Sequence, residues 1–133
     1  GEKMLVVFRG GPQAENAARL LEAVRRLGDA GGLHLPFPVS VGVSAGPVIS
    51  GFIGSGPRRD HTVIGDAVNT AARLLACADK LAGRPRVVLS ASCRALLPEG
   101  ESCVSLGSVE VKGKSEPLNI YRILYSVTER NQA

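Results

Sequence analysis

The stretch Arg58–Arg73, RRDHTVIGDAVNTAAR, decides how this chain folds and where its chemistry lies. Asn69 and Arg73 stand four residues apart in it, so on a helix their side chains project from one face, one turn apart. A neutral amide and a planar, permanently charged guanidinium aimed at one point form a good receptor for phosphate oxygens. Taken alone, however, the pair is more typical of a cap-region amide and a surface salt bridge.

The residues around that pair predict a strand, a turn and a helix. His61–Ile64 is predicted to form a short strand, and Gly65 turns the chain into the helix. We expect Asp66 to cap this helix and the helix to continue to about Lys80. A helix N-terminus adds positive potential and free N–H donors, which favour an anionic ligand at this place.

The rest of the chain alternates apolar strands with amphipathic helices, which predicts one α/β or α+β domain. Strands are predicted at 4–8, 39–44, 48–54, 87–89, 104–111 and 118–125, and further helices at 13–27 and 91–97. Ser90 is expected to cap the last helix, and the turn at Lys112–Lys114 to join the last two strands into a hairpin. The domain is expected to span 1–126, followed by a frayed tail at 127–133. Because an apolar strand begins after only three residues, we expect that sequence has been lost upstream.

Composition and charge limit the function classes. The net charge of +4 fits an anionic ligand, but the basic residues are dispersed and aromatic residues make up only 4% of the chain. That pattern predicts a solvated basic surface and no nucleic-acid partner. The three cysteines, Cys77, Cys93 and Cys103, lack CxxC spacing, so neither a zinc site nor a disulfide partner is expected. Without a signal peptide or a membrane-length apolar run, the chain is expected to be cytoplasmic, and an anchor elsewhere in the parent protein stays open.

Two glycine motifs in the middle of the chain resemble catalytic signatures without meeting their requirements. Gly42–Gly46 matches G-x-S-x-G, the nucleophile elbow of serine hydrolases, which needs a strand, a sharp turn and then a helix. Here Pro47–Ile49 continues as strand and His61 is the only later histidine, so the motif is interpreted as a hairpin. The glycines at 51, 54 and 56 are not followed by Gly-Lys-Ser or Gly-Lys-Thr at P-loop spacing.

Four segments, in order along the chain, carry a resemblance to a known family. They are Val41–Val48 with Gly51 and Gly54, then His61–Arg73, then Leu106–Gly107, and finally Val111–Lys114 with Tyr121. Together they resemble the class III adenylyl/guanylyl cyclase catalytic domain, and G-x-x-V-N-x-A-x-R at the helix start is the most specific of them. The resemblance covers essentially the whole chain and is weak before Val39.

The resemblance implies a ferredoxin-like α+β fold, truncated at its N-terminus so that the first strand and helices are missing. It implies conversion of ATP to 3′,5′-cyclic AMP and pyrophosphate, with Mg²⁺ or Mn²⁺ as cofactor. The family acts as a head-to-tail dimer, so the implied partner is a second cyclase domain, in a homodimer or a heterodimer.

The same resemblance assigns roles position by position. Asn69 matches the amide that orients the ribose, and Arg73 matches the arginine that stabilises the phosphoryl group as the 3′-oxygen attacks. Lys112, in preference to Lys114, matches the basic residue that reaches the terminal phosphates. Thr62 falls where the family reads the purine edge, and a hydroxyl there occurs in adenylyl rather than guanylyl cyclases.

The family's metal-binding positions lie mostly outside this chain. The second of two metal-binding aspartates falls at Glu2, whose carboxylate is a possible oxygen ligand for Mg²⁺. The first aspartate, and the lysine that partners the purine edge, are expected upstream of Gly1. Three interpretations stay open: an active cyclase with its metal site completed upstream, a half-site whose partner supplies the metals, and a non-catalytic regulatory or dimerisation module. Use of GTP instead of ATP is a further alternative.

Overall fold

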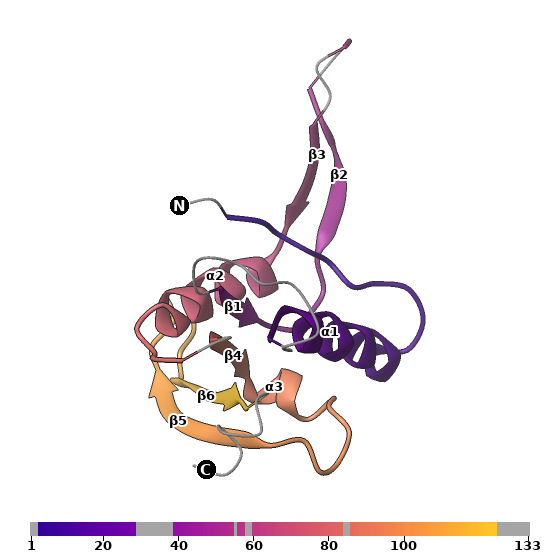
Figure 1. Cartoon of the computed structure of the whole chain (residues 1–133). Helices are drawn as coiled ribbons and strands as arrows, with labels where there is room; N and C mark the ends of the chain where they lie inside the picture. The colour runs from indigo at the N-terminus through magenta and orange to yellow at the C-terminus, as the bar shows by residue number, and fades with distance from the viewer. Residues whose placement is uncertain (1–2, 29–38, 55, 58–59, 84–85, 125–133) are drawn as a thin grey trace.

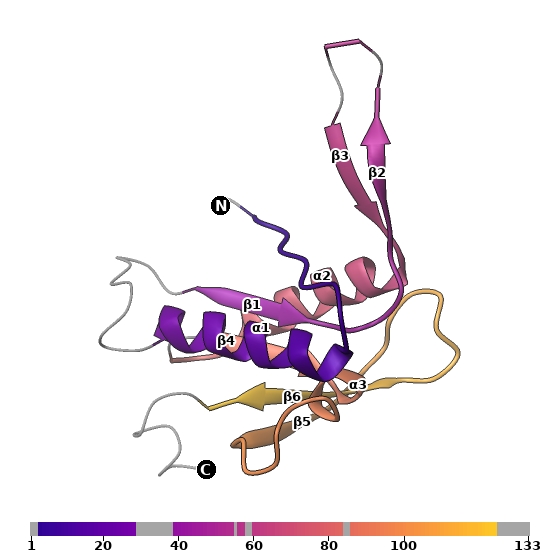
Figure 2. The same ribbon diagram turned by 90° about the vertical axis from the view of Figure 1, so that its right-hand side faces the viewer.

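The computed structural model describes residues 3–28, 39–54, 56–57, 60–83 and 86–124. Its body is a four-stranded sheet covered by helices, and a two-stranded arm projects from that body (Figure 1, Figure 2). The mixed α+β architecture predicted from the sequence is confirmed. The predicted tail at 127–133 and the segment 29–38 lie outside the described residues.

The sheet of the body has the strand order β1-β4-β6-β5. β1 (Ser40–Val43) lies parallel to β4 (Arg86–Ser90), and the chain between them runs through the arm and α2 (Asp66–Ala78). β6 (Leu118–Ile123) is antiparallel both to β4 and to β5 (Cys103–Val109). The predicted closing hairpin is therefore confirmed, and its turn carries Lys112 and Lys114.

The core consists of two layers, one on each face of β4. Val87 and Leu89 pack with Val24 of α1 (Gln13–Gly28), whereas Val88, between them in sequence, packs with Leu74 of α2. Successive side chains of a strand point to opposite faces, so this alternation places α1 and α2 on opposite sides of the sheet (Figure 2). Burial on both faces explains why β4 is a continuous apolar run in the sequence.

α2 approaches β1 so closely that only glycine fits at position 42. A Cβ on Gly42 would lie 2.2 Å from the carbonyl oxygen of Ala71 and 2.3 Å from the backbone nitrogen of Leu75. Both atoms belong to the helix backbone, so no side-chain rotation relieves the overlap. The first glycine of the G-x-S-x-G match is thus required by packing, and the chain after the match enters β2 rather than a helix.

The arm consists of β2 (Ile49–Ile53) and β3 (Asp60–Ile64), which pair antiparallel in a sheet of their own. The prediction of a hairpin at Gly42–Gly46 is therefore wrong, because β1 pairs with β4 and β2 pairs with β3. A two-stranded ribbon has one layer only, and apolar side chains on the arm are left exposed. They are Ile49, Phe52 and Ile64.

The N-terminal apolar segment does not form the predicted strand. Met4–Val7 are exposed and pair with no strand in the described ranges (Figure 1). A strand is stable only when its backbone N–H and C=O groups find partners on a neighbouring strand. Apolar, β-prone composition alone was therefore not enough to make this segment a strand.

The short helix α3 (Ala91–Arg94) begins as predicted and ends early. The Ser90 hydroxyl accepts the backbone N–H of Cys93 at 3.3 Å, which confirms the predicted cap. The helix stops before Leu97 because Pro98 disfavours a helical residue before it, and the N–H of Leu97 bonds instead to the Arg94 carbonyl at 3.1 Å. Among the helices of the described ranges, none has the length and apolar composition needed to cross a membrane.

Candidate functional site

The candidate site starts where β3 passes directly into α2. Gly65 is the N-cap of α2 in an extended conformation, with no side-chain cap, so the prediction that Asp66 caps the helix is wrong. Asp66 is already helical. A Cβ at Gly65 would lie 3.0 Å from the Pro47 carbonyl oxygen, so a capping residue with a side chain does not fit without displacing backbone.

α2 presents one buried stripe and one exposed stripe. Thr70, Leu74 and Ala78 recur every four residues and face the sheet. Asn69 and Arg73 each come one position before a buried residue, and both are exposed. The pair is thus held by a helix whose other side is locked into the core, and it faces away from that core.

Arg73 also links α2 to the end of the closing hairpin. Its Nε donates a long hydrogen bond, 3.4 Å, to the backbone carbonyl of Glu110. The remaining guanidinium N–H groups have no partner in the described part of the chain. Arg73 therefore keeps donors available for an anionic ligand beside the turn Val111–Lys114, called the lysine turn from here on.

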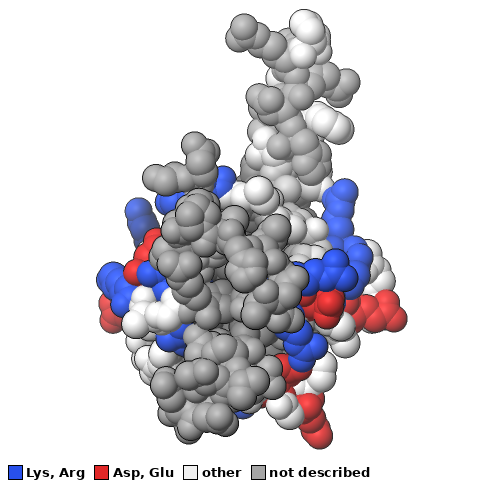
Figure 3. All heavy atoms as spheres, viewed as in Figure 1, with Lys and Arg blue, Asp and Glu red and all other residues white. Residues whose placement is uncertain are grey.

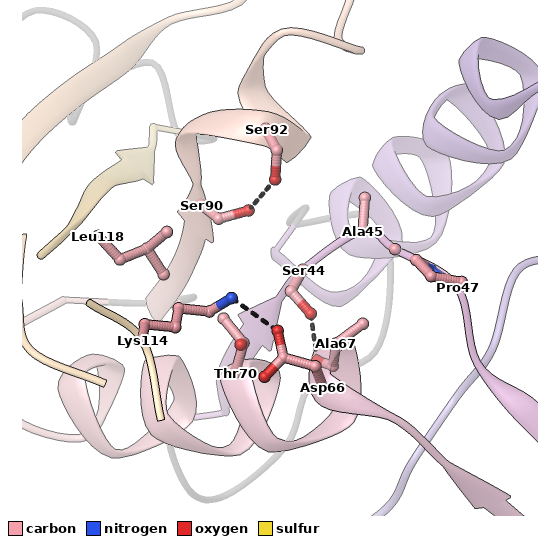
Figure 4. Close-up of a pocket in the computed structure, with 11 residues that line it drawn as sticks. Ser44, Ala45, Pro47, Asp66, Ala67, Thr70, Ser90, Ser92, Lys114 and Leu118 are labelled. Atoms are coloured by element: carbon pink, nitrogen blue, oxygen red, sulfur yellow. Dashed lines mark hydrogen bonds and ion pairs between the residues drawn. The ribbon is translucent and has the colours of Figure 1, made fainter. Parts of the chain in front are cut away.

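The lysine turn places its two lysines in different surroundings. The N–H of Lys114 bonds to the Val111 carbonyl at 3.1 Å, and Gly113 has a φ of +89°, as the third residue of a type II turn requires. Val111 is buried and anchors the turn. Lys112 is exposed without a hydrogen bond or ion pair to any described residue, whereas the Lys114 ammonium lies 2.6 Å from an Asp66 carboxylate oxygen (Figure 4).

A cavity of about 210 Å³ lies between α2, the segment after β1 and the start of α3. Its polar lining consists of hydroxyl groups and the Lys114–Asp66 pair (Figure 4). The Ser44 hydroxyl donates to the Ala67 carbonyl, and the hydroxyls of Ser90 and Ser92 are 3.0 Å apart. The buried Thr70 hydroxyl, on a residue only 4% exposed, has no partner among the described residues. No motif in the sequence predicted this cavity.

The remaining predicted residues lie elsewhere. Thr62 is half-buried on the arm, opposite Gly51, and Asn69, Arg73, Thr62 and Lys112 do not line the cavity. Glu2, the predicted metal ligand, lies outside the described residues. Within the described ranges, no three His, Cys, Asp or Glu side chains are placed to hold a metal ion.

The charge distribution and the state of the cysteine thiols limit the kinds of chemistry that this chain could perform. On the face seen in Figure 3, lysines and arginines are interspersed with acidic residues rather than gathered into one basic stripe. Burial, and then the nearby Cys103, raise the pKa of Cys93 to about 11, and burial raises the pKa of Cys103 as well. Both thiols are therefore protonated at neutral pH, which argues against either as a nucleophile.

Comparison with known proteins places this geometry in a family. A family model described as the adenylate and guanylate cyclase catalytic domain matches residues 14–124. The chain is 36% identical over 86 residues to an adenylate cyclase of Anabaena cylindrica, which covers 64% of this chain and 17% of that protein. It is 37% identical over 90 residues to the guanylate cyclase soluble subunit beta-2 of Rattus norvegicus, which covers 66% of this chain and 12% of that protein.

The structure gives the same answer. The crystal structure of the adenylyl cyclase CyaB from P. aeruginosa matches it with a TM-score of 0.58 and 28% sequence identity, over 84% of this chain and 54% of that chain. The chain thus spans about half of that crystallised chain and a small part of the curated relatives. The family predicted from the sequence motifs is confirmed: this chain belongs to the adenylate and guanylate cyclase catalytic domain family.

Proposed function

We propose that this chain is the nucleotide-binding part of a cyclase that converts ATP to 3′,5′-cyclic AMP and pyrophosphate, at an interface with a second cyclase domain. One observation on α2 carries the proposal. Asn69 and Arg73 are exposed one turn apart, and Arg73 bonds to the backbone carbonyl that leads into the lysine turn. Polar groups suited to a ribose and to a triphosphate therefore come from one connected part of the body.

The proposed reaction is an intramolecular phosphoryl transfer. The ribose 3′-oxygen forms a bond to the α-phosphorus while the bond from that phosphorus to the oxygen bridging to the β-phosphate breaks. Pyrophosphate leaves with the electron pair of that bond, and the 3′-hydroxyl proton passes to solvent. Such a step depends on positioning and charge stabilisation more than on covalent chemistry.

The two residues of α2 receive the central roles. The Arg73 guanidinium is assigned to the oxygens of the α-phosphoryl group, where negative charge is distributed during the transfer. The Asn69 amide is assigned to the ribose, which it holds so that the 3′-oxygen points at the phosphorus. Because both side chains rise from a helix packed on the sheet, their relative position is set before the nucleotide binds.

Lys112 and Thr62 are assigned to the two ends of the nucleotide. The Lys112 ammonium, which pairs with none of the described residues, is suited to the terminal phosphates, and the Thr62 hydroxyl on the arm is suited to the purine edge. Adenine is the proposed base, from the family pattern at Thr62. GTP is the second candidate, because a guanylate cyclase subunit is among the relatives at similar identity.

The metal ions of the proposed reaction, Mg²⁺ or Mn²⁺, receive no ligand among the described residues. The lone acidic residue at the start of α2, Asp66, already pairs with Lys114 at 2.6 Å, and a cationic neighbour disfavours a bound cation. When bound, such ions neutralise phosphate charge. The described residues themselves do not fit a metal site, and they contribute positioning and positive charge.

Cyclic nucleotide formation by the full-length protein, measured with ATP and GTP in parallel and with Mg²⁺ or Mn²⁺, tests the proposal. We expect cyclic AMP as the main product. Arg73→Ala should lower kcat by about 10³-fold, since a transition-state arginine contributes at least that much in phosphoryl transfer. Arg26→Ala is the matched control, because it removes an exposed guanidinium of α1 that pairs with Glu22, and kcat should not change.

Each outcome of this assay decides between the interpretations. Unchanged cyclic AMP formation by Arg73→Ala contradicts the role assigned to Arg73. Cyclic GMP as the main product selects the guanylyl cyclase. A protein that binds nucleotide but forms neither product is the non-catalytic module, and the proposed reaction is then wrong.

A further inference from the structure

We propose that Asp66 is a positioning residue: it holds Lys114, and through Lys114 the turn that presents Lys112 to the terminal phosphates. The inference rests on the proposed function, because it concerns how the same nucleotide site is assembled. It assigns different roles to two lysines that the sequence alone left as alternatives. Lys114 forms an ion pair within the protein, and Lys112 binds the ligand.

The contact itself is direct. The Lys114 ammonium lies 2.6 Å from Asp66 Oδ2, within the range of a charge-assisted hydrogen bond. The Lys114 side chain is only 32% exposed, whereas the Asp66 side chain is 66% exposed. Lys114 is thus drawn back against the body, toward the helix start, instead of extending into solvent (Figure 4).

The two lysines occupy different positions in the turn. Lys112 and Gly113, whose φ is +89°, are its two central residues, and Lys114 is its last residue. Lys114 ends the turn with its N–H on the Val111 carbonyl, and Lys112 lies at the exposed corner. An ion pair on Lys114 therefore fixes the corner without using the charge of Lys112.

A second contact makes the arrangement a frame rather than a single link. Two contacts join the lysine turn to α2. The first is the ion pair of Lys114 with Asp66 at the start of the helix, and the second is the hydrogen bond from Arg73 to the Glu110 carbonyl. The three residues assigned to ribose and phosphates then belong to one unit. Each of the two contacts is partly exposed and weak alone, so the two together hold the turn that presents Lys112.

A double-mutant cycle in the full-length protein tests this role. Asp66→Asn and Lys114→Met should each raise the ATP KM about threefold to tenfold while changing kcat less than twofold, because a loosened turn weakens phosphate binding without removing Arg73. The double variant should be no worse than either single variant. The exchange Asp66→Lys with Lys114→Asp should recover most of the lost affinity. Glu116→Gln, at an exposed acid of the same loop, is the control and should change nothing.

Two further measurements keep this inference separate from the proposed function. The ATP Kd, measured by calorimetry, reports the coupling even if no cyclic nucleotide forms, in which case only the proposed reaction fails. In NMR spectra of lysine side chains, Asp66→Asn should shift the Lys114 ammonium signal, and an unchanged Lys114 signal contradicts the ion pair.

Two results overturn the inference. The first is additivity, with the double variant losing the product of the two single losses, because independent residues would behave in that way. The second is a Lys114→Met variant that loses as much ATP affinity as Lys112→Met while Asp66→Asn loses none. Lys114 would then be the phosphate ligand, and Asp66 would have no part in positioning.

Discussion

The body and the arm of this domain differ in how tightly they are packed. In the body, β4 is buried between two helices, and α2 approaches β1 to within backbone contact at Gly42. The arm has two strands, exposed apolar side chains, and open space where a Cβ at Gly51 would lie. The residues assigned to the reacting phosphate stand on the body, and the residue assigned to the base stands on the arm.

Under the proposed function, this division matches the precision that each task needs. In phosphoryl transfer, a displacement of about 1 Å at the reacting atoms costs on the order of 10²-fold in rate. A helix locked by Leu74 and Ala78 against the sheet provides that precision. The proposed contact of Thr62 to the base edge needs less precision, and Thr62 stands on a ribbon of two strands only.

The sharpest way to break the comparison is to add one methyl group to each region. Gly42→Ala forces a Cβ into the α2 backbone, so the free energy of unfolding should fall by about 3 kcal/mol, the upper end for overpacking. Gly51→Ala, in the arm, is the matched control, and its Cβ meets nothing within 4 Å, so a change within about 0.5 kcal/mol is expected. Urea unfolding measures both. Equal losses in the two variants would show that the arm is as tightly packed as the body.

The next prediction sharpens the functional half of the comparison. Thr62→Val keeps the shape of the side chain and removes its hydroxyl, so it should change the ratio of kcat/KM for ATP over GTP about tenfold, with kcat for the better nucleotide nearly unchanged. Stability should stay the same, because Thr62 is only half-buried on the arm. Ser108→Ala, which removes an exposed hydroxyl from β5, serves as the control. An unchanged ratio contradicts the assignment of Thr62 to the purine edge.

The smallest expected effect concerns the pH dependence of the body. Folding raises the pKa of Cys93 from 9.0 to about 11, mainly by burial, so the folded protein binds this proton more tightly than the unfolded chain does. The associated stability is complete below pH 9 and is lost progressively as the pH rises toward 11, with a loss of about 1 kcal/mol by pH 10. Unfolding between pH 8 and 10 measures it. Cys93→Ala should flatten this slope, and an unchanged slope would mean that another group causes it.

Most helices and strands could be predicted from the sequence, because their signals are local. The helix after Gly65 and the closing hairpin follow from spacing and turn residues only a few positions apart. Predictions failed where a distant partner decides. Residues 4–8 have strand composition without a neighbouring strand, and β1 pairs with β4 across more than forty residues instead of with β2.

In the candidate site, too, local features could be predicted from the sequence and long-range contacts could not. The spacing of Asn69 and Arg73 is local, so their common face was predictable, and their roles stay a prediction. The pairing of Asp66 with Lys114 joins residues 48 positions apart, and no local pattern signals it. The sequence instead suggested Asp66 as a helix cap, because aspartate before a helix is a common capping residue.

By itself, then, the sequence determined the family and most of the helices and strands, and it predicted the residues suited to a nucleotide, because motif spacing and periodicity are properties of neighbouring residues. Only the tertiary structure decided that α2 and the lysine turn form one frame, and that Lys114 faces the protein while Lys112 faces outward. It also decided that β2 and β3 leave the body as an arm. The physical reason is that ion pairs and strand pairing join residues that are distant along the chain, and only the folded arrangement brings them together.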